Sequence, residues 1–127
     1  MKSVVIAYIA GMMDGEGSIF ISKQSGLYCQ LHIQISNTNL FLLEKIKEML
    51  SFLSVKSYIV KSGNNVKKDK PWKQGWKLLI NKKKNQYFFL ELLEPYLIDK
   101  QKQARLVLKY SLKNIYDEIK ELNKRGI

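Results

Sequence analysis

The chain has 127 residues, of which 46% are hydrophobic, so it suits one domain spanning residues 1–127 and is not compositionally disordered. Its formal net charge of +11 favours a polyanionic partner, with nucleic acid first and an anionic membrane second; a soluble protein with a lysine-rich surface is the alternative. A single cysteine, Cys29, excludes a disulfide within the chain and argues against a cysteine-based zinc site, so we interpret it as a small core residue.

The first predicted element is a helix over residues 3–14, with Ser3 as its cap and Gly15 and Gly17 at its end. The apolar run 4–13 is far shorter than the ~20 residues that a transmembrane helix needs. No small-x-small cleavage site follows it, so it does not fit a signal peptide. We therefore expect a buried helix in an intracellular protein with no membrane partner.

Residues 18–36 predict two antiparallel strands joined by a turn at Ser25 and Gly26. The alternation of apolar and polar residues divides the side chains between two faces. One face is apolar and carries Ile19, Ile21, Leu27, Cys29, Leu31, Ile33 and Ile35. The other carries Phe20, Ser22, Gln24, Tyr28, Gln30, His32 and Gln34. Such a pattern is typical of a half-buried sheet.

Asn37-Thr38-Asn39 is a cap signal for a second helix, whose stripe is Leu40, Leu43, Ile46, Lys47 and Leu50. A third strand is expected near 55–62, with its facing left open. A polar, lysine-rich loop follows from Gly63 to about Trp72. The fourth strand, about 74–81, directs Trp76, Leu78 and Ile80 to one face.

Residues 82–84 are expected to form a basic connector, and residues 86–94 a short helix that is broken before Pro95. The last helical region starts near Lys100 and has a break near Ser111. The predicted fold is therefore an α+β domain, in which helices cover the apolar face of the sheet and the polar face stays bare. A bare polar face is either solvated or, given the net charge, used to contact nucleic acid.

The first helix carries small residues at helical spacing, Ala7, Gly11 and Gly15, with Ala10 beside them. Small residues at this spacing let two helix backbones approach closely. A glycine inside a helix lowers its stability by roughly 0.5–1 kcal/mol relative to alanine. We therefore expect close packing to offset the cost of Gly11. The packing partner is either another helix of this chain or a second copy of the same helix.

Two acids, Asp14 and Glu16, come where the helix dipole disfavours negative charge. Asp14 could be an exposed turn residue, but glutamate is a poor turn residue between glycines. Carboxylates at a disfavoured position favour a divalent cation, and hard oxygen ligands suit Mg²⁺.

At these residues the sequence resembles a known family. IAGMMDGEG, residues 9–17, resembles the nine-residue LAGLIDADG motif of the homing endonucleases, and the following SIF also fits. PYLIDKQKQARLVLK, residues 95–109, is similar to a later segment of the members that carry a single motif. The resemblance extends over about residues 6–110.

The resemblance implies an αββαββα homing-endonuclease fold, with a saddle-shaped antiparallel sheet and helices on one face. It implies a homodimer with Ala7, Ala10, Gly11, Asp14 and Gly15 at the interface. It also implies Glu16, Asn37 and Lys100 as catalytic residues, and Glu16 with Gly15 as the metal site for Mg²⁺ or Mn²⁺. Glu16 stands where the family usually has aspartate.

The implied function is site-specific hydrolysis of both strands of a near-palindromic double-stranded DNA. The candidate DNA-binding residues are Ser22, Gln24, Tyr28, Gln30, His32, Gln34, Lys61 and Lys77, while lysines of 67–73 and 82–84 would contact phosphates. One alternative is a non-catalytic nucleic-acid binder or a splicing maturase that binds intron RNA. Another is a basic structural or ribosome-associated protein. An organelle or a bacterial or phage cytoplasm is the expected location.

Overall fold

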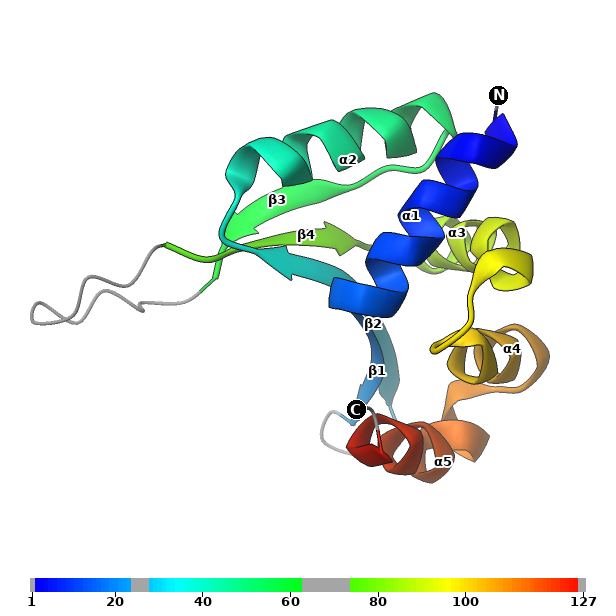
Figure 1. The fold of residues 1–127 in the computed structure, drawn as a ribbon. Coiled ribbons are helices and arrows are strands. Elements are labelled where there is room, and N and C mark those ends of the chain that lie inside the picture. The colour runs from blue at the N-terminus through cyan, green and yellow to red at the C-terminus, as the bar shows by residue number, and fades with distance from the viewer. Residues whose placement is uncertain (1, 24–27, 63–73, 126–127) are drawn as a thin grey trace, which may run out of the picture.

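The computed structural model describes residues 2–23, 28–62 and 74–125. The elements follow the predicted order of a helix, two strands, a helix, two strands and further helices (Figure 1). They are α1 (Lys2–Glu16), β1 (Gly17–Lys23), β2 (Cys29–Asn37), α2 (Leu40–Phe52), β3 (Tyr58–Lys61), β4 (Trp76–Ile80), α3 (Lys83–Leu93), the 3-10 turn η1 (Glu94–Tyr96), α4 (Gln101–Lys109) and α5 (Leu112–Arg125). Gln24, Leu27, the turn at Ser25 and Gly26, and the lysines of 67–73 lie outside the described residues.

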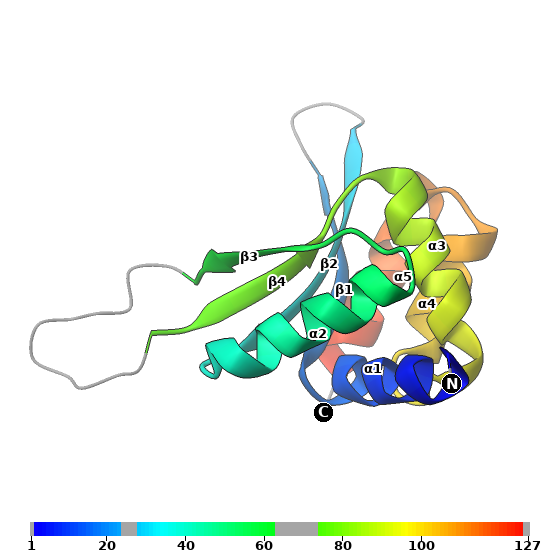
Figure 2. The same ribbon diagram turned by 90° about the horizontal axis from the view of Figure 1, so that it is seen from above.

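The four strands form one antiparallel sheet in the order β1-β2-β4-β3. Its register aligns the apolar positions across strands, because Ile33 pairs with Ile19 on one side and with Ile80 on the other. The sheet is strongly twisted, and the helices lie on one face of it (Figures 1 and 2). The predicted α+β architecture with one bare sheet face is confirmed.

The core lies between the apolar face of the sheet and the helices. α1 contributes Ile6, Ile9, Ala10 and Met13; α2 contributes Leu43, Ile46 and Leu50; α3 contributes Phe89, Leu90 and Leu93. Each set follows helical spacing, so one stripe of each helix is removed from water. None of the helices in the described ranges is long and apolar enough to cross a bilayer.

The bounds of α1 differ from the prediction at both ends. The helix begins at Lys2, so Ser3 lies in its first turn, and it continues through Gly15 to Glu16. The chain leaves the helix at Gly17, where a Cβ atom would lie 2.5 Å from the Sδ atom of Met13. Gly17 is thus required by close packing, whereas Gly15 is an ordinary helical residue.

Two further predicted bounds are wrong. β3 spans only Tyr58–Lys61, because Val55 is buried in the core and the backbone of Lys56 bonds to Asn85 rather than to a strand. α3 begins at Lys83, so most of the predicted basic connector is helical. Positive side chains oppose a helix N-terminus, but burial of the following side chains outweighs that cost.

Candidate functional site

The open face of β1 and β2 carries a small cluster centred on His32. Its Nε2 atom lies 2.7 Å from the Oγ atom of Ser22, and its ring stacks on Phe20 with centroids 4.7 Å apart. Burial lowers the pKa of His32 from its ordinary value of 6.5. The imidazole is therefore held neutral and in a fixed orientation on the polar face.

The other candidates on this face differ in exposure. Tyr28 and Gln30 are exposed, while Gln34 and Lys77 are half-buried. Lys61 does not share the face, because it pairs with Trp76, and Lys77 pairs with Val60. The side chain of Lys61 therefore leaves on the helix-covered side, with its Nζ atom 6.0 Å from the ring centroid of Trp76.

Two residues singled out by the resemblance meet at the C-terminal end of α1. The exposed Glu16 carboxylate accepts a short hydrogen bond from the Nδ2 atom of Asn37. The Oδ1 atom of Asn37 accepts from the backbone N–H of Asn39 at 2.8 Å, and Asn39 caps α2 through the N–H of Leu42 at 3.1 Å. Asn37 thus links Glu16 to the first turn of α2.

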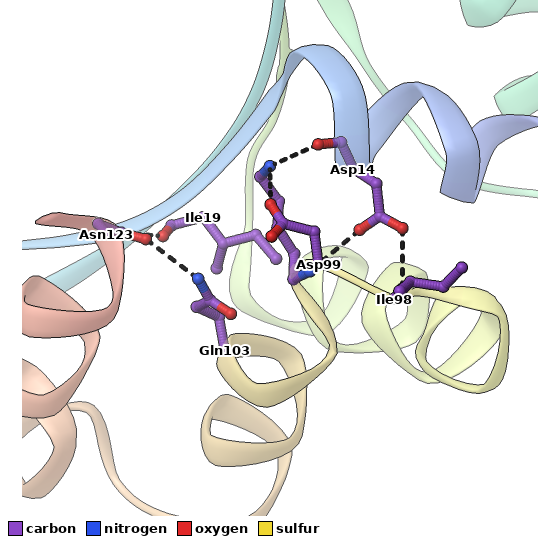
Figure 3. Close-up of polar contacts among 7 residues, drawn as sticks. Asp14, Ile19, Ile98, Asp99, Gln103 and Asn123 are labelled. Carbon is purple, nitrogen blue, oxygen red and sulfur yellow. Dashed lines mark hydrogen bonds and ion pairs between the residues drawn. The ribbon is translucent and has the colours of Figure 1, made fainter. Parts of the chain in front are cut away.

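The carboxylate of Asp14 has hydrogen-bond donors within the same chain. Its carboxylate oxygens accept from the backbone N–H groups of Ile98 at 2.8 Å and of Lys100 at 3.0 Å (Figure 3). The ammonium of Lys100 donates to the backbone oxygen of Asp14 at 3.0 Å. The carboxylate therefore holds the backbone of the segment that leads into α4, while the ammonium complements the end of α1.

Lys100 is largely buried, with 14% of its side chain exposed and its Nζ atom 3.5 Å from the Oδ2 atom of Asp99. A hollow of about 480 Å³ opens beside it. Its lining is Asp14, Gly15, Gly17, Ser18, Phe20, Asp99, Lys100, Gln103 and Asn123. The lysine is thus placed at the end of α1 next to the first residues of β1.

A polar link that the sequence did not indicate joins three elements in the lining of this hollow. The Nε2 atom of Gln103 lies 3.3 Å from the Oδ1 atom of Asn123, whose Nδ2 atom donates to the backbone oxygen of Ile19 at 3.0 Å (Figure 3). α4, α5 and β1 are therefore connected. The helical positions of Gln103 and Asn123 carried no distinguishing signal.

The small-residue stripe of α1 faces away from the core. Ala7, Gly11 and Gly15 are exposed, and a Cβ atom added at either glycine would meet nothing within 4 Å. Among the described residues, none packs closely against these glycines, so the expectation that Gly11 packs on another helix of the chain is not met there. Ala10 is a correction, because it is fully buried among core residues and cannot contact a partner.

No group of three or more His, Cys, Asp or Glu side chains that could hold a metal ion occurs in the described part of the chain. The Glu16 carboxylate and the backbone carbonyl of Gly15 are oxygen ligands in the last turn of α1, whereas the carbonyl of Asp14 accepts from Lys100. This donor set fits Mg²⁺, which takes one or two carboxylates and retains water molecules.

A family model described as LAGLIDADG-like domain matches residues 3–94. This span includes Glu16 and Asn37 and ends before Lys100. No curated protein matches the sequence.

Three solved structures illustrate the similarity of the fold. The homing endonuclease I-CvuI, in complex with its target in the presence of Ca, is 19% identical, with a TM-score of 0.67 over 98% of this chain and 76% of that chain. The archaeal intron-encoded homing endonuclease I-Vdi141I, complexed with DNA, is 17% identical, with a TM-score of 0.61 over 98% and 99%. The LAGLIDADG meganuclease I-AabMI, bound to uncleaved DNA, is 26% identical, with a TM-score of 0.65 over 95% of this chain and 40% of that chain.

Proposed function

The chain belongs to the family of LAGLIDADG-like domains, and on this premise we propose that it is a site-specific DNA endonuclease that works as a homodimer. The observation that carries the proposal is the exposed Glu16 carboxylate, held by Asn37 where α1 runs into the sheet. Similar structures in complex with DNA support a duplex substrate.

DNA is expected on the open face of the sheet. Gln30, His32 and Gln34 alternate along β2 and offer donors and acceptors for base edges in the major groove. Lys82, Lys83 and Lys84 are exposed and suit phosphate contacts, which position the duplex without reading its sequence. The net charge of +11 supports such binding and predicts that it weakens steeply with salt.

The dimer would form through the exposed stripe of α1. Ala7, Gly11 and Gly15 allow close approach of two helix backbones, and Tyr8 is 46% exposed beside them. Glu16 follows this stripe at the end of the helix, so a two-fold axis along the stripe would bring two copies of the carboxylate near each other. Such an arrangement suits cleavage of both strands.

In this proposal, Glu16 and the backbone carbonyl of Gly15 would hold a divalent cation. When bound, Mg²⁺ or Mn²⁺ would polarise the scissile phosphate and lower the pKa of a water molecule. Asn37 orients the Glu16 carboxylate, and the ammonium of Lys100 offers positive charge for an oxygen that gains negative charge. Asp14 acts indirectly, because its carboxylate holds the backbone of Lys100 in place.

The test begins with cleavage of a randomised-site DNA library in Mg²⁺, which identifies a target. On that target, Glu16→Gln should lower the cleavage rate at least about a hundredfold. Binding measured in Ca²⁺ should persist. Glu44→Gln, a change of an exposed acid on α2, is the matched control and should cleave normally.

Unchanged cleavage by Glu16→Gln would refute the assignment of the catalytic carboxylate. A wild-type protein that binds duplex DNA but never cuts it in Mg²⁺ or Mn²⁺ would refute the nuclease and favour a non-catalytic binder.

A further inference from the structure

A second hollow, of about 520 Å³, lies where α2 leads into β3. Its lining residues are Lys47, Ser51, Ser54, Val55, Lys56 and Ser57. Apart from Val55, each of them carries an ammonium or a hydroxyl group, and no carboxylate lines the hollow. α2 packs on the helix-covered side of the sheet (Figure 2). The hollow beside its end is therefore not part of the open face.

Ser54 lies in a conformation that serine rarely adopts. Its φ is 65°, directly after the helix, where glycine is the usual residue. Its backbone N–H donates to the carbonyl of Ser51 at 2.9 Å, so the turn closes the end of α2. Glycine would meet this backbone requirement with less strain, whereas serine adds a hydroxyl at the hollow.

The neighbouring segment is fixed in place. Asn85 of α3 accepts from the backbone N–H of Lys56 at 3.0 Å and donates to its carbonyl at 2.6 Å. Ser57 lies in the wall between this hollow and a smaller one of about 220 Å³ that Lys82 also lines. The Ser57 hydroxyl is buried and has no hydrogen-bond partner among the residues described. Because this oxygen is shielded from solvent, Ser57 belongs to the wall of the hollow and is not one of the groups that would donate to a ligand.

We propose that this hollow is a binding site for a phosphate group. Lys47 and Lys56 supply positive charge, which must also offset the partial negative charge at the C-terminal end of α2, and the hydroxyls of Ser51 and Ser54 donate hydrogen bonds. A tetrahedral phosphate has several acceptor oxygens and suits donors that arrive from different elements, with lysine acting as a point charge. The group could come from a nucleic-acid strand that runs outside the open face or from free phosphate.

The first test is a titration of the ¹⁵N-labelled protein with inorganic phosphate at constant ionic strength, followed through the backbone amide signals of residues 51–57. We expect a saturable shift of these signals. Lys56→Gln and Ser54→Gly should each weaken binding about tenfold, which corresponds to about 1.4 kcal/mol. Lys109→Gln removes an exposed lysine of α4 away from the hollow and should bind as the wild type does.

Ser54→Gly separates loss of the site from loss of the fold, because glycine suits a φ of 65° and the urea midpoint should not fall. A shift that does not saturate, or that is equal in wild type and in both site variants, would overturn the proposal.

A second titration distinguishes the source of the phosphate and uses a short single-stranded RNA with hydroxyl ends, which offers diesters alone. If the RNA moves the same signals at lower concentration than inorganic phosphate, and Lys56→Gln weakens this effect, the source is a nucleic-acid strand. If only inorganic phosphate moves them, the source is free phosphate. If neither does, no phosphate site exists.

Discussion

Asp14 is the residue for which the contacts in the fold differ most from what its place in the sequence suggests. An acid at the end of a helix is unfavourable by itself, yet Asp14 accepts hydrogen bonds from two backbone N–H groups of the segment just before α4. These two hydrogen bonds stabilise the carboxylate although it lies at the C-terminal end of α1. The same contacts hold Lys100 against α1.

Asp14→Ala removes both acceptors. Hydrogen bonds to a charged group contribute about 1.5–3 kcal/mol, so the free energy of unfolding should fall by about that amount in urea titrations. Cleavage should fall as well, because the backbone of Lys100 loses its anchor. Glu44→Ala, on the exposed side of α2, should change stability by less than about 0.5 kcal/mol. Equal stability of the two variants would show that Asp14 does not hold the start of α4.

The environment of His32 predicts a pH effect with a definite sign. Burial lowers its pKa below 6.5 in the folded protein, so the unfolded chain binds the proton at higher pH. The contribution of the neutral ring is present above pH 6.5 and is lost as pH falls from 6.5 toward the folded pKa. The urea midpoint should therefore fall further between about pH 7.5 and about pH 5.5 in wild type than in His32→Gln. An equal drop would contradict this assignment.

At the scale of elements, a buried glutamine joins two strands where they separate. The Nε2 atom of Gln86 donates to the backbone oxygens of Leu31 at 2.8 Å and of Ile80 at 2.9 Å. Ile80 is the last residue of β4, and Leu31 lies beyond the part of β2 that pairs with β4. α3 thus completes the hydrogen bonding of the sheet.

Gln86→Met keeps the size of the side chain but leaves two carbonyls unpaired. The expected loss is about 1–3 kcal/mol of unfolding free energy per unsatisfied group. Gln30→Met, at an exposed position of β2, should stay within about 0.5 kcal/mol of wild type. Equal urea midpoints for the two variants would mean that water replaces the amide.

The elements that the sequence predicted well are those with one dominant periodicity. Leu31, Ile33 and Ile35 alternate with polar residues, and this pattern alone assigned β2 and its two faces. The third strand was misjudged because Val55 and Lys56 are held by α2 and Asn85, which are tertiary contacts without a local signal. The hydrogen bond between Glu16 and Asn37 joins residues 21 apart, and no local pattern predicts it.

At the scale of the molecule, α1 has two faces with separate tasks. Ile9 and Met13 are fully buried in the core, while Gly11 faces outward with free space around it. The spacing of the small residues already favoured a second copy of the helix over another helix of the same chain, and the resemblance implies the same partner. The exposure of Gly11 and Gly15 supports that choice.

Gly11→Leu should therefore leave the fold of one chain intact but prevent close approach of two chains. Sedimentation equilibrium should find a dimer for wild type and a monomer for the variant, with unchanged far-UV circular dichroism. Asn114→Leu, at an exposed position of α5, controls for added surface leucine and should remain dimeric. A monomeric wild type, or a dimeric Gly11→Leu, would refute the interface.

The contact between Asp14 and Lys100 also determines how late in synthesis the C-terminal end of α1 can gain its hydrogen bonds. The two residues are 86 positions apart, so α1 leaves the ribosome long before the segment 98–100 that binds its C-terminal end. A nascent chain of 90 or so residues already carries Glu16 and Asn37, yet it lacks the lysine and the backbone donors of 98–100. Truncated chains therefore keep the motif but lack the hydrogen bonds between Asp14 and residues 98–100. These bonds can form only when most of the 127 residues have been made.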